Sequence, residues 1–409
     1  MKILHFADAH IDMANYGRRD PESGLPLRVL DFLKSLDTIV DTAIAEQVDL
    51  VLFAGDAYKD RNPAPTYQRE WGRRIMRLSK AGIPVLLLVG NHDLSPALGR
   101  AHALEAFDTL DVPYVTVADR PAFYTPDVLG VPLQVIALPW ISPSGIVAYL
   151  DLSLNDPAEA REKLENRLAG LIDAWVARRN PDLPLILAAH TTVQGAVYGG
   201  ERTVMLGKDI ELSGSLVRNP AFQYVALGHI HKRQNLNPDG QPPVIYPGSI
   251  ERVDFGEAGE DKFFVIAEIE PDQPTRLDWR KLETRPFLDM ECTLEQDAED
   301  LTAILLAYLQ PPEKLRDAIV RLRVTYPAEW ESRIDDALLR QAAAPAFEFH
   351  LVKRPQSEAR VRLQTDVDLS SLSQADLLER YLKSVHVSPE EIAELQELAR
   401  PLFASPDEI

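Results

Sequence analysis

The sequence is poor in the features that mark secreted and membrane-spanning proteins. Its single cysteine, Cys292, permits no internal disulfide, and we interpret it as a buried packing residue. No apolar run reaches the roughly 18 residues that a membrane span needs. The first residues also lack the apolar core and the small-residue cleavage site of a signal peptide. We therefore expect a cytoplasmic protein with no membrane partner.

Basic charge is also scarce. Lysine and arginine total 43 against 63 acidic residues, which gives a formal net charge of -20. This balance disfavours non-specific binding to nucleic acid, because neutralising phosphates supplies most of that affinity. It does not exclude nucleic acid as a partner, since a local basic patch can bind phosphates and several acidic residues are candidate metal ligands.

The first two thirds of the chain alternate between strand-like and helical patterns. Apolar spacing predicts helices over residues 31–46 and 67–78. Short β-branched runs predict strands at residues 3–7, 49–54, 83–89, 134–138, 185–189, 224–227, 244–246 and 263–269. This alternation indicates an α/β core.

The last third follows a different pattern. Its predicted elements are a strand (287–293), a helix (298–309), a strand (318–326), a helix (330–343) and a strand (347–353), which indicates a small α+β unit. A polar stretch then leads to two short amphipathic helices, 373–385 and 389–403. We predict domains at residues 1–279, 280–354 and 355–409.

Nearly every predicted strand of the first domain ends in a polar cluster, and strand ends are where α/β folds place their chemistry. Taken singly, most of these clusters also suit a turn, a helix cap or a buried histidine. His229 and His231 carry a stronger signal, because alternate residues of a strand point to one face. The clusters, in chain order, are Asp8-Ala9-His10, Gly55-Asp56, Gly90-Asn91-His92-Asp93, His190 and Gly228-His229-Ile230-His231.

Aspartate, asparagine and histidine without thiolate suit Mn, Fe or Zn better than Ca. Two divalent cations about 3.5–4 Å apart can activate water and neutralise the charge of a phosphoryl transition state. A carboxylate between them is needed to hold the ions that close. The sequence thus predicts a two-metal phosphoesterase.

These five blocks, in this order, resemble the signature blocks of the calcineurin-like metallophosphoesterases over about residues 1–270. The resemblance implies a four-layer α/β/β/α core of two packed mixed sheets. It further implies that Asp8, His10 and His231 hold one metal ion, that Asn91, His190 and His229 hold the other, and that Asp56 bridges them. His92 would act as general acid or transition-state stabiliser, with Asp93 orienting its ring.

One departure concerns the second block. The family usually has another aspartate three residues after the bridging one, whereas Asp60 here follows Asp56 by four. We therefore leave Asp60 out of the predicted metal site.

Within the family the chain resembles SbcD, the nuclease subunit of bacterial SbcCD complexes, in residues 190–195 and 246–257 and in its C-terminal architecture. The resemblance implies a manganese-dependent, nucleoid-associated nuclease that acts on duplex ends and on single-stranded or hairpin DNA. An SMC-like ATPase would dock on residues 373–403. The alternative for these helices is a packing appendage of the α+β unit.

The resemblance also implies a homodimer, with Trp71, Ile75 and Leu104 as interface candidates. Candidate DNA contacts are Lys59, Arg61 and Arg252. A run of arginines follows the second block and could track phosphates or form a solvated helix face: Arg69, Arg73, Arg74 and Arg77.

Two other functions fit the same residues. A phosphatase or phosphodiesterase for a small substrate would use the same chemistry, but it would not explain the C-terminal domains. A non-catalytic scaffold for an ATPase is expected to have lost ligands, whereas this ligand set is intact.

Overall fold

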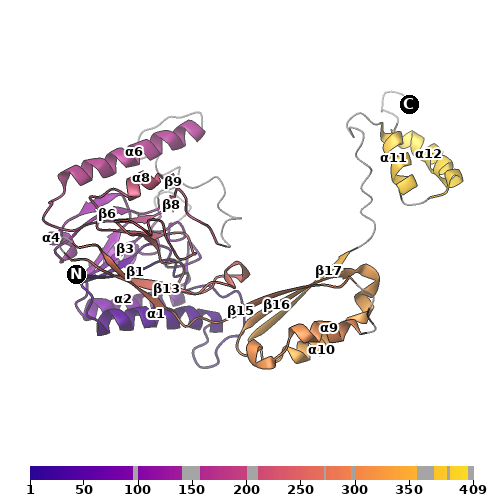
Figure 1. Cartoon of the computed structure of the whole chain (residues 1–409), viewed down its shortest axis with the longest axis horizontal. Coiled ribbons are helices and arrows are strands. Elements are labelled where there is room, and N and C mark those ends of the chain that lie inside the picture. Colours follow the sequence, from indigo (N-terminus) through magenta and orange to yellow (C-terminus); the bar gives the residue numbers. More distant parts are fainter. Residues whose placement is uncertain are drawn as a thin grey trace. The chain divides into compact units, whose positions relative to one another are not determined.

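Figure 1 shows the computed structural model of the chain. It describes residues 1–94, 100–140, 157–199, 211–270, 273–295, 298, 300–356, 373–384 and 387–403. The chain divides into two compact units. The first comprises residues 1–289, 314–320 and 345–348, and the second comprises residues 290–313, 321–344 and 349–409. Within the described ranges, no helix combines the length and the apolar character needed to cross a membrane.

Two six-stranded mixed sheets form the first unit. The first sheet has the order β14-β13-β1-β2-β3-β4, and the second has the order β11-β12-β10-β7-β6-β5. The strands of the first are β1 (Lys2–Phe6), β2 (Leu50–Phe53), β3 (Val85–Leu88), β4 (Val115–Ala118), β13 (Phe263–Glu268) and β14 (Arg276–Lys281). Those of the second are β5 (Ala122–Tyr124), β6 (Gln134–Leu138), β7 (Leu185–His190), β10 (Tyr224–Gly228), β11 (Gln234–Asn235) and β12 (Val244–Tyr246).

Most inner strands of each sheet run parallel. In the first sheet β1, β2, β3 and β4 are parallel, and β13 and β14 pair antiparallel at one edge. In the second sheet β6, β7, β10 and β12 are parallel between the antiparallel edge strands β5 and β11. Parallel neighbours end at the same edge of a sheet, so the segments that follow them are brought together.

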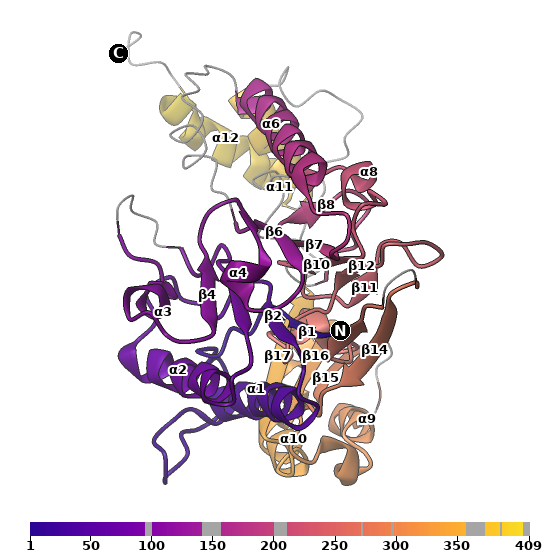
Figure 2. The same cartoon turned by 90° about the vertical axis from the view of Figure 1, so that its left-hand side faces the viewer.

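Helices cover the outer face of each sheet, as Figure 2 shows. Helices α1 (Leu27–Ala45) and α2 (Pro65–Lys80) bury Phe32 and Trp71 against residues of the first sheet such as Phe6. Helices α6 (Pro157–Arg178) and α8 (Gly214–Val217) cover the second sheet, with Ile172 in its cluster. A third apolar cluster joins the inner faces of the two sheets and includes Ile3. The predicted α/β/β/α fold is confirmed.

Short elements complete the first unit. They are α3 (Glu105–Thr109), α4 (Pro126–Leu129), the strand pair β8 (Thr192–Val193) and β9 (Glu211–Leu212), and the 3-10 turn η1 (Phe255–Glu257).

All eight strands predicted in the first two thirds of the chain overlap observed ones, but several elements, among them α6, β4, β5 and β14, were not predicted. The predicted domain boundary at residue 279 falls inside β14, which pairs with β13. The first unit therefore continues to Asp289.

The three strands β15 (Phe287–Thr293), β16 (Ile319–Pro327) and β17 (Glu348–Gln356) form a third sheet, in that order. The second unit also contains α9 (Leu301–Tyr308) and α10 (Asp336–Ala342), while η2 (Pro312–Leu315) is divided between the two units. The predicted helix 330–343 is instead a 3-10 segment, η3 (Ala328–Arg333), followed by α10. The break is caused by Asp335, whose carboxylate caps α10 by accepting from the N–H groups of Ala337 and Leu338.

The two predicted C-terminal helices are present as α11 (Gln374–Ser384) and α12 (Pro389–Phe403). They pack on each other, and the Gln396 amide donates to Glu379 at 3.2 Å. The predicted linker falls mostly on residues 357–372, which lie outside the described residues.

Candidate metal centre

The predicted ligands all follow strands of the two sheets. β1 leads to Asp8 and His10, β2 to Asp56 and β3 to Asn91, while β7 ends at His190 and β10 leads to the last two histidines. The register joins these segments: the Asp8 N–H donates to Gly55 O at 2.9 Å, and Gly228 pairs with His190. Exposed fractions are at most 5% for Asp8, His10, Asp56, Asn91, His190 and His229, and His231 has a side chain that is 12% exposed.

The seven side chains lie in one cluster. Ligand atoms of Asp8, His10 and His231 lie within 4.8 Å of one another, and so do those of Asp8, Asp56 and His190. Asp56 Oδ2 stands between the two predicted sets, 3.9 Å from His10 Nε2 and 3.4 Å from His190 Nε2. Asp8 also belongs to both groups, which the sequence did not indicate.

Hydrogen bonds to fixed acceptors set the orientation of three of the histidine rings. Nδ1–H of His10 donates to Tyr58 O at 3.1 Å, and Nδ1–H of His190 donates to Ala54 O at 2.6 Å. His231 Nδ1–H donates to the Glu257 carboxylate at 2.8 Å. Each bond turns Nε2 toward the cluster, which is how proteins orient metal-binding imidazoles.

The donor atoms of this cluster fit a cation. His10 Nε2 and His231 Nε2 face each other at 3.1 Å, and two such nitrogens need a proton or a metal ion between them. Asn91 Oδ1 lies 3.0 Å from His190 Nε2 and 3.0 Å from His229 Nδ1. Two carboxylates, one amide oxygen and four imidazoles without thiolate suit a borderline divalent cation such as Mn, Fe or Zn.

The electrostatics of the cluster also demand positive charge. Burial raises the pKa of Asp8, because a carboxylate loses its hydration there. Burial also disfavours a charged His190, but the Asp56 carboxylate outweighs this and raises the pKa of His190 to about 9. Burial lowers the pKa of His10 and keeps that ring neutral. A neutral imidazole beside buried carboxylates is the protonation state that binds metal.

Strained backbone marks the same residues. Four of them have a positive φ: Asp8 at 51°, His10 at 39°, Asp56 at 64° and His229 at 98°. Such conformations cost energy in L-residues and cluster at functional sites. The glycines of the motifs allow close approach, since a Cβ on Gly90 would overlap the Asp56 carboxylate.

His92 and Asp93 depart from the predicted pairing. The half-buried His92 ring lies 5.2 Å from that of His10, and its Nδ1–H donates to Lys59 O at 2.6 Å. Asp93 accepts instead from the backbone N–H groups of Asp56, Ala57 and Gly90 at 2.9, 3.0 and 2.9 Å. The prediction that Asp93 orients the His92 ring is therefore wrong: a backbone carbonyl does so, and Asp93 braces the loop that carries Asp56.

Behind His231, a buried ion pair that the sequence pattern did not reveal supports the ring. Glu257 accepts from His231, from Ser249 Oγ at 3.1 Å and from Lys262, whose ammonium lies 2.6 Å away. Lys262 and His231 lower the pKa of Glu257 well below its usual range despite burial. The sequence contained one signal for Glu257, which is its place at the end of residues 246–257, the run that carries the resemblance to the SbcD subgroup.

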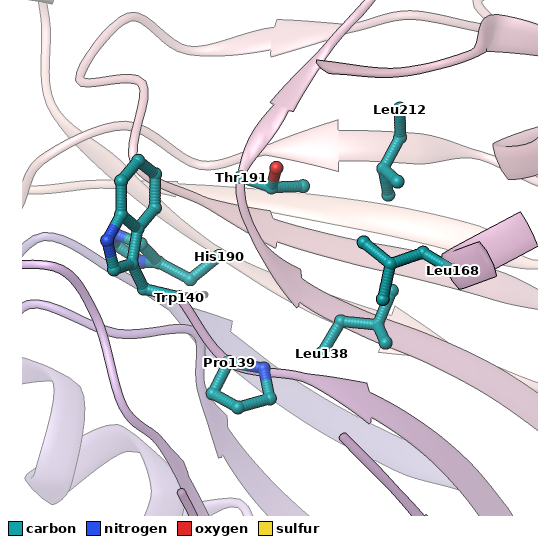
Figure 3. A pocket seen from close by; sticks show the side chains of 7 residues that line it. All are labelled: Leu138, Pro139, Trp140, Leu168, His190, Thr191 and Leu212. Atoms are coloured by element: carbon teal, nitrogen blue, oxygen red, sulfur yellow. The ribbon is translucent and has the colours of Figure 1, made fainter. Parts of the chain in front are cut away.

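Trp140 was also missed. It follows β6, and its ring lies 4.9 Å from that of His229 at an interplanar angle of 33°. Figure 3 shows it next to His190, at a pocket lined also by Leu138 and Thr191. The pocket has room for only about one water molecule. Its lining side chains, most of them apolar, therefore pack as a wall behind the candidate ligands.

The basic residues divide into two groups. Lys59 and Arg61 are exposed on the loop after Asp56. Arg252 is only 8% exposed and donates to Thr284 Oγ1 at 2.6 Å and to Arg285 O at 3.0 Å. The prediction that Arg252 contacts DNA is thus corrected, because its guanidinium is bound inside the first unit.

The α2 arginines form ion pairs with acidic neighbours. Arg74 pairs with Glu70 and with Asp37 of α1, and Arg77 pairs with Asp37 and Asp41. Arg69 and Arg73 both pair with Glu70. This arrangement favours the structural interpretation of that helix face over a phosphate-tracking surface.

The three predicted dimer residues are core residues of the chain itself. Trp71, Ile75 and Leu104 are each 0% exposed and belong to the cluster between the first sheet and its helices. Their side chains cannot contact a second copy, so this prediction is wrong for all three. Their apolar character came from intrachain packing, which a sequence pattern cannot distinguish from an interface.

A four-layer α/β/β/α core with histidine, aspartate and asparagine donors meeting at its strand ends defines a metal-binding phosphoesterase architecture. The family model described as "Calcineurin-like phosphoesterase" matches residues 1–233, more than half of the chain. The chain therefore belongs to the calcineurin-like phosphoesterase family, whose members use divalent metals.

Three proteins show which relatives the chain resembles in sequence. The SbcD subunit of the SbcCD nuclease of Escherichia coli (strain K12) is 30% identical over 275 residues, covering 64% of this chain and 64% of that protein. Its counterpart from Rhodobacter capsulatus is 32% identical over 277 residues, with 64% coverage of each chain. "DNA double-strand break repair protein Mre11" of Archaeoglobus fulgidus is 26% identical over 340 residues, covering 79% of this chain and 68% of that protein. The match thus spans about 64% of the length of the two SbcD proteins.

Proposed function

We propose that the protein is a metal-dependent DNA nuclease that hydrolyses phosphodiesters with two divalent cations, and that it is the nuclease subunit of an SbcCD-like repair complex. The observation that supports this most is the convergence of seven nitrogen and oxygen donors, six of them buried, at the ends of parallel strands. The relatives named above, nuclease subunits and a double-strand break repair protein, supply the substrate class.

In this proposal Asp8, His10 and His231 hold one cation, Asn91, His190 and His229 hold the other, and Asp56 contacts both. The two cations, most suitably Mn²⁺, supply Lewis acidity that activates water and balances the charge on the phosphoryl oxygens.

The residues of the chain have separate tasks. The Lys59 carbonyl holds Nδ1–H of His92, which leaves Nε2 as the ring atom that exchanges a proton with the substrate. Asp93 keeps Asp56 in place through the backbone of its loop. Lys59 and Arg61, exposed beside the site, contact the phosphates that flank the scissile bond.

The partner proposals concern residues outside the ligand set. Helices α11 and α12 carry exposed apolar side chains, among them Tyr381 and Leu398 at 54% and 68% exposure. We propose that an SMC-like ATPase docks on this pair. A homodimer also remains a proposal, with its interface residues unassigned.

A direct assay tests the central proposal. With Mn²⁺, the purified protein should degrade linear duplex DNA and lose this activity in EDTA. Bis(p-nitrophenyl) phosphate and p-nitrophenyl phosphate serve as small-ester comparators. Turnover of the small esters with intact DNA would instead identify a small-substrate phosphoesterase, and no hydrolysis of any ester would favour a scaffold.

The His92→Ala variant tests the role of the ring. Loss of a general acid typically costs about 10²- to 10⁴-fold in rate, whereas Mn²⁺ affinity by calorimetry and thermal stability should stay close to wild type. Equal activity of the variant and wild type would refute this role.

A further inference from the structure

Asp12 lies two residues beyond the metal candidate His10, and its carboxylate binds the loop that follows Asp56. Its Oδ1 accepts from the Lys59 N–H at 2.5 Å, and its Oδ2 accepts from the Asp60 N–H at 3.0 Å. The side chain is half-buried. Neither bond touches the metal centre, so the function described so far does not use this residue.

The two peptide groups that Asp12 holds are the ones that orient active-site histidines. The carbonyl of the Tyr58–Lys59 peptide accepts Nδ1–H of His10, and the carbonyl of the Lys59–Asp60 peptide accepts Nδ1–H of His92. A trans peptide is planar, with its N–H and C=O pointing in opposite directions. Fixing the two N–H groups therefore fixes the two carbonyls as well.

The loop is held at both ends by carboxylates. Asp93 binds the N–H groups of Asp56 and Ala57, and Asp12 binds those of Lys59 and Asp60. Between these anchors, Tyr58 is 1% exposed and packs near Trp71. Without Asp12, the half of the loop that carries both carbonyl acceptors would lose its anchor.

We propose that Asp12 is a positioning residue that acts through two peptide planes, one aimed at His92 and one at His10. The inference deepens the proposed hydrolase function and rests on it. Through His92 it sets the turnover rate, and through His10 it sets metal affinity. These two effects can be separated.

The test is a double-mutant cycle of Asp12→Ala and His92→Ala, measured on whichever phosphodiester the wild type hydrolyses. At saturating Mn²⁺, Asp12→Ala should lower kcat about 10- to 100-fold, the size expected when a catalytic group is misplaced by about 1 Å. In the His92→Ala background the same change should alter kcat less than about two-fold, because the ring it positions is gone. The Mn²⁺ Kd should rise about ten-fold in both backgrounds, as for other partners of ligand histidines.

Matched variants complete the design. Asp12→Asn keeps one acceptor oxygen and should give intermediate losses, which preserves the test if Asp12→Ala folds poorly. Asp20 offers the same chemistry in a neighbouring loop, where it accepts from Ser23 N at 2.7 Å and Ser23 Oγ at 2.6 Å. Asp20→Ala should change neither kcat nor Kd.

Each outcome bears on one idea only. An Asp12→Ala loss that is equally large with and without His92 would overturn the proposal, and so would wild-type kcat and Kd in Asp12→Ala. A wild type that hydrolyses no phosphodiester would overturn the proposed function instead. The Mn²⁺ Kd of Asp12→Ala, compared with that of the wild type, would still test whether Asp12 acts through His10.

Discussion

At the scale of single residues, the centre depends on groups that never touch the cations. The ligand types were visible in the sequence, because five clusters of aspartate, asparagine and histidine follow its predicted strands, although most single clusters also suit a turn or a cap. Their supports were not visible. Tyr58 and Ala54 support His10 and His190 through their backbone carbonyls. Because every residue has a backbone carbonyl, the residue type could not indicate this role.

Glu257 makes a testable case among these supports. Glu257→Gln keeps an acceptor for His231 but removes the charge that polarises the ring. Mn²⁺ affinity measured by calorimetry should fall about 10- to 100-fold, as is typical when such a partner is changed. The variant should also lose stability, because Lys262 is 1% exposed and loses an ion-pair partner.

The double variant Glu257→Gln/Lys262→Met separates these two effects. It removes the buried ammonium together with the carboxylate, so stability should recover while metal affinity stays low. Full recovery of affinity in the double variant would show that Glu257 acts on folding alone.

His5 is a buried titratable residue of the first sheet. It is 0% exposed, and its Nδ1 lies 2.8 Å from the Tyr224 hydroxyl. Burial lowers its pKa from 6.5 to about 3. Between pH 6.5 and about 3, His5 is therefore protonated in the unfolded chain and neutral in the folded chain. The free energy of unfolding consequently falls as the pH falls toward 3. From pH 7.5 to 5.5 this residue should cost about 1.4 kcal/mol.

The measurement is guanidinium unfolding followed by tryptophan fluorescence in EDTA. Trp330 is the only tryptophan in the second unit, so a Trp330→Phe background makes the signal report the first unit. The variant His5→Phe/Tyr224→Phe removes both polar partners. Its free energy of unfolding should fall by about 1.4 kcal/mol less than that of the reference protein between pH 7.5 and 5.5. All other titrating groups are shared, so an unchanged slope would contradict the assignment.

At the scale of elements, a sequence pattern predicted the structure correctly where only one kind of packing produces it. It failed where two kinds of packing produce the same pattern. Buried β-branched runs gave the eight strands, and the parallel order then brought their ends together. An apolar stripe on α2 can bury against a sheet or against a second copy, and here Trp71 and Ile75 bury against the chain's own sheet. The arginines of α2 were equally ambiguous until their partners on α1, such as Asp37, were seen.

At the scale of the whole molecule, the candidate ligands all belong to one of the two units. Residues 8–231 lie in the first unit, and none of the seven comes from residues 290–409. Metal binding should therefore stabilise the first unit alone. Mn²⁺ at a concentration of 100 Kd adds about 2.7 kcal/mol to the free energy of unfolding, which should raise Tm by several degrees for a domain of this size.

Thermal unfolding in the Trp330→Phe background, with Mn²⁺ or with EDTA, measures this shift in the first unit. Asp56→Asn supplies the control, because it replaces the carboxylate that lies between the two predicted sets of ligands by an amide of the same shape. This variant should lose most of the Mn²⁺-dependent increase in Tm and keep the Tm measured in EDTA within a few degrees. A wild-type shift retained in full by Asp56→Asn would mean that Mn²⁺ binds elsewhere, and the two-metal centre would have to be abandoned.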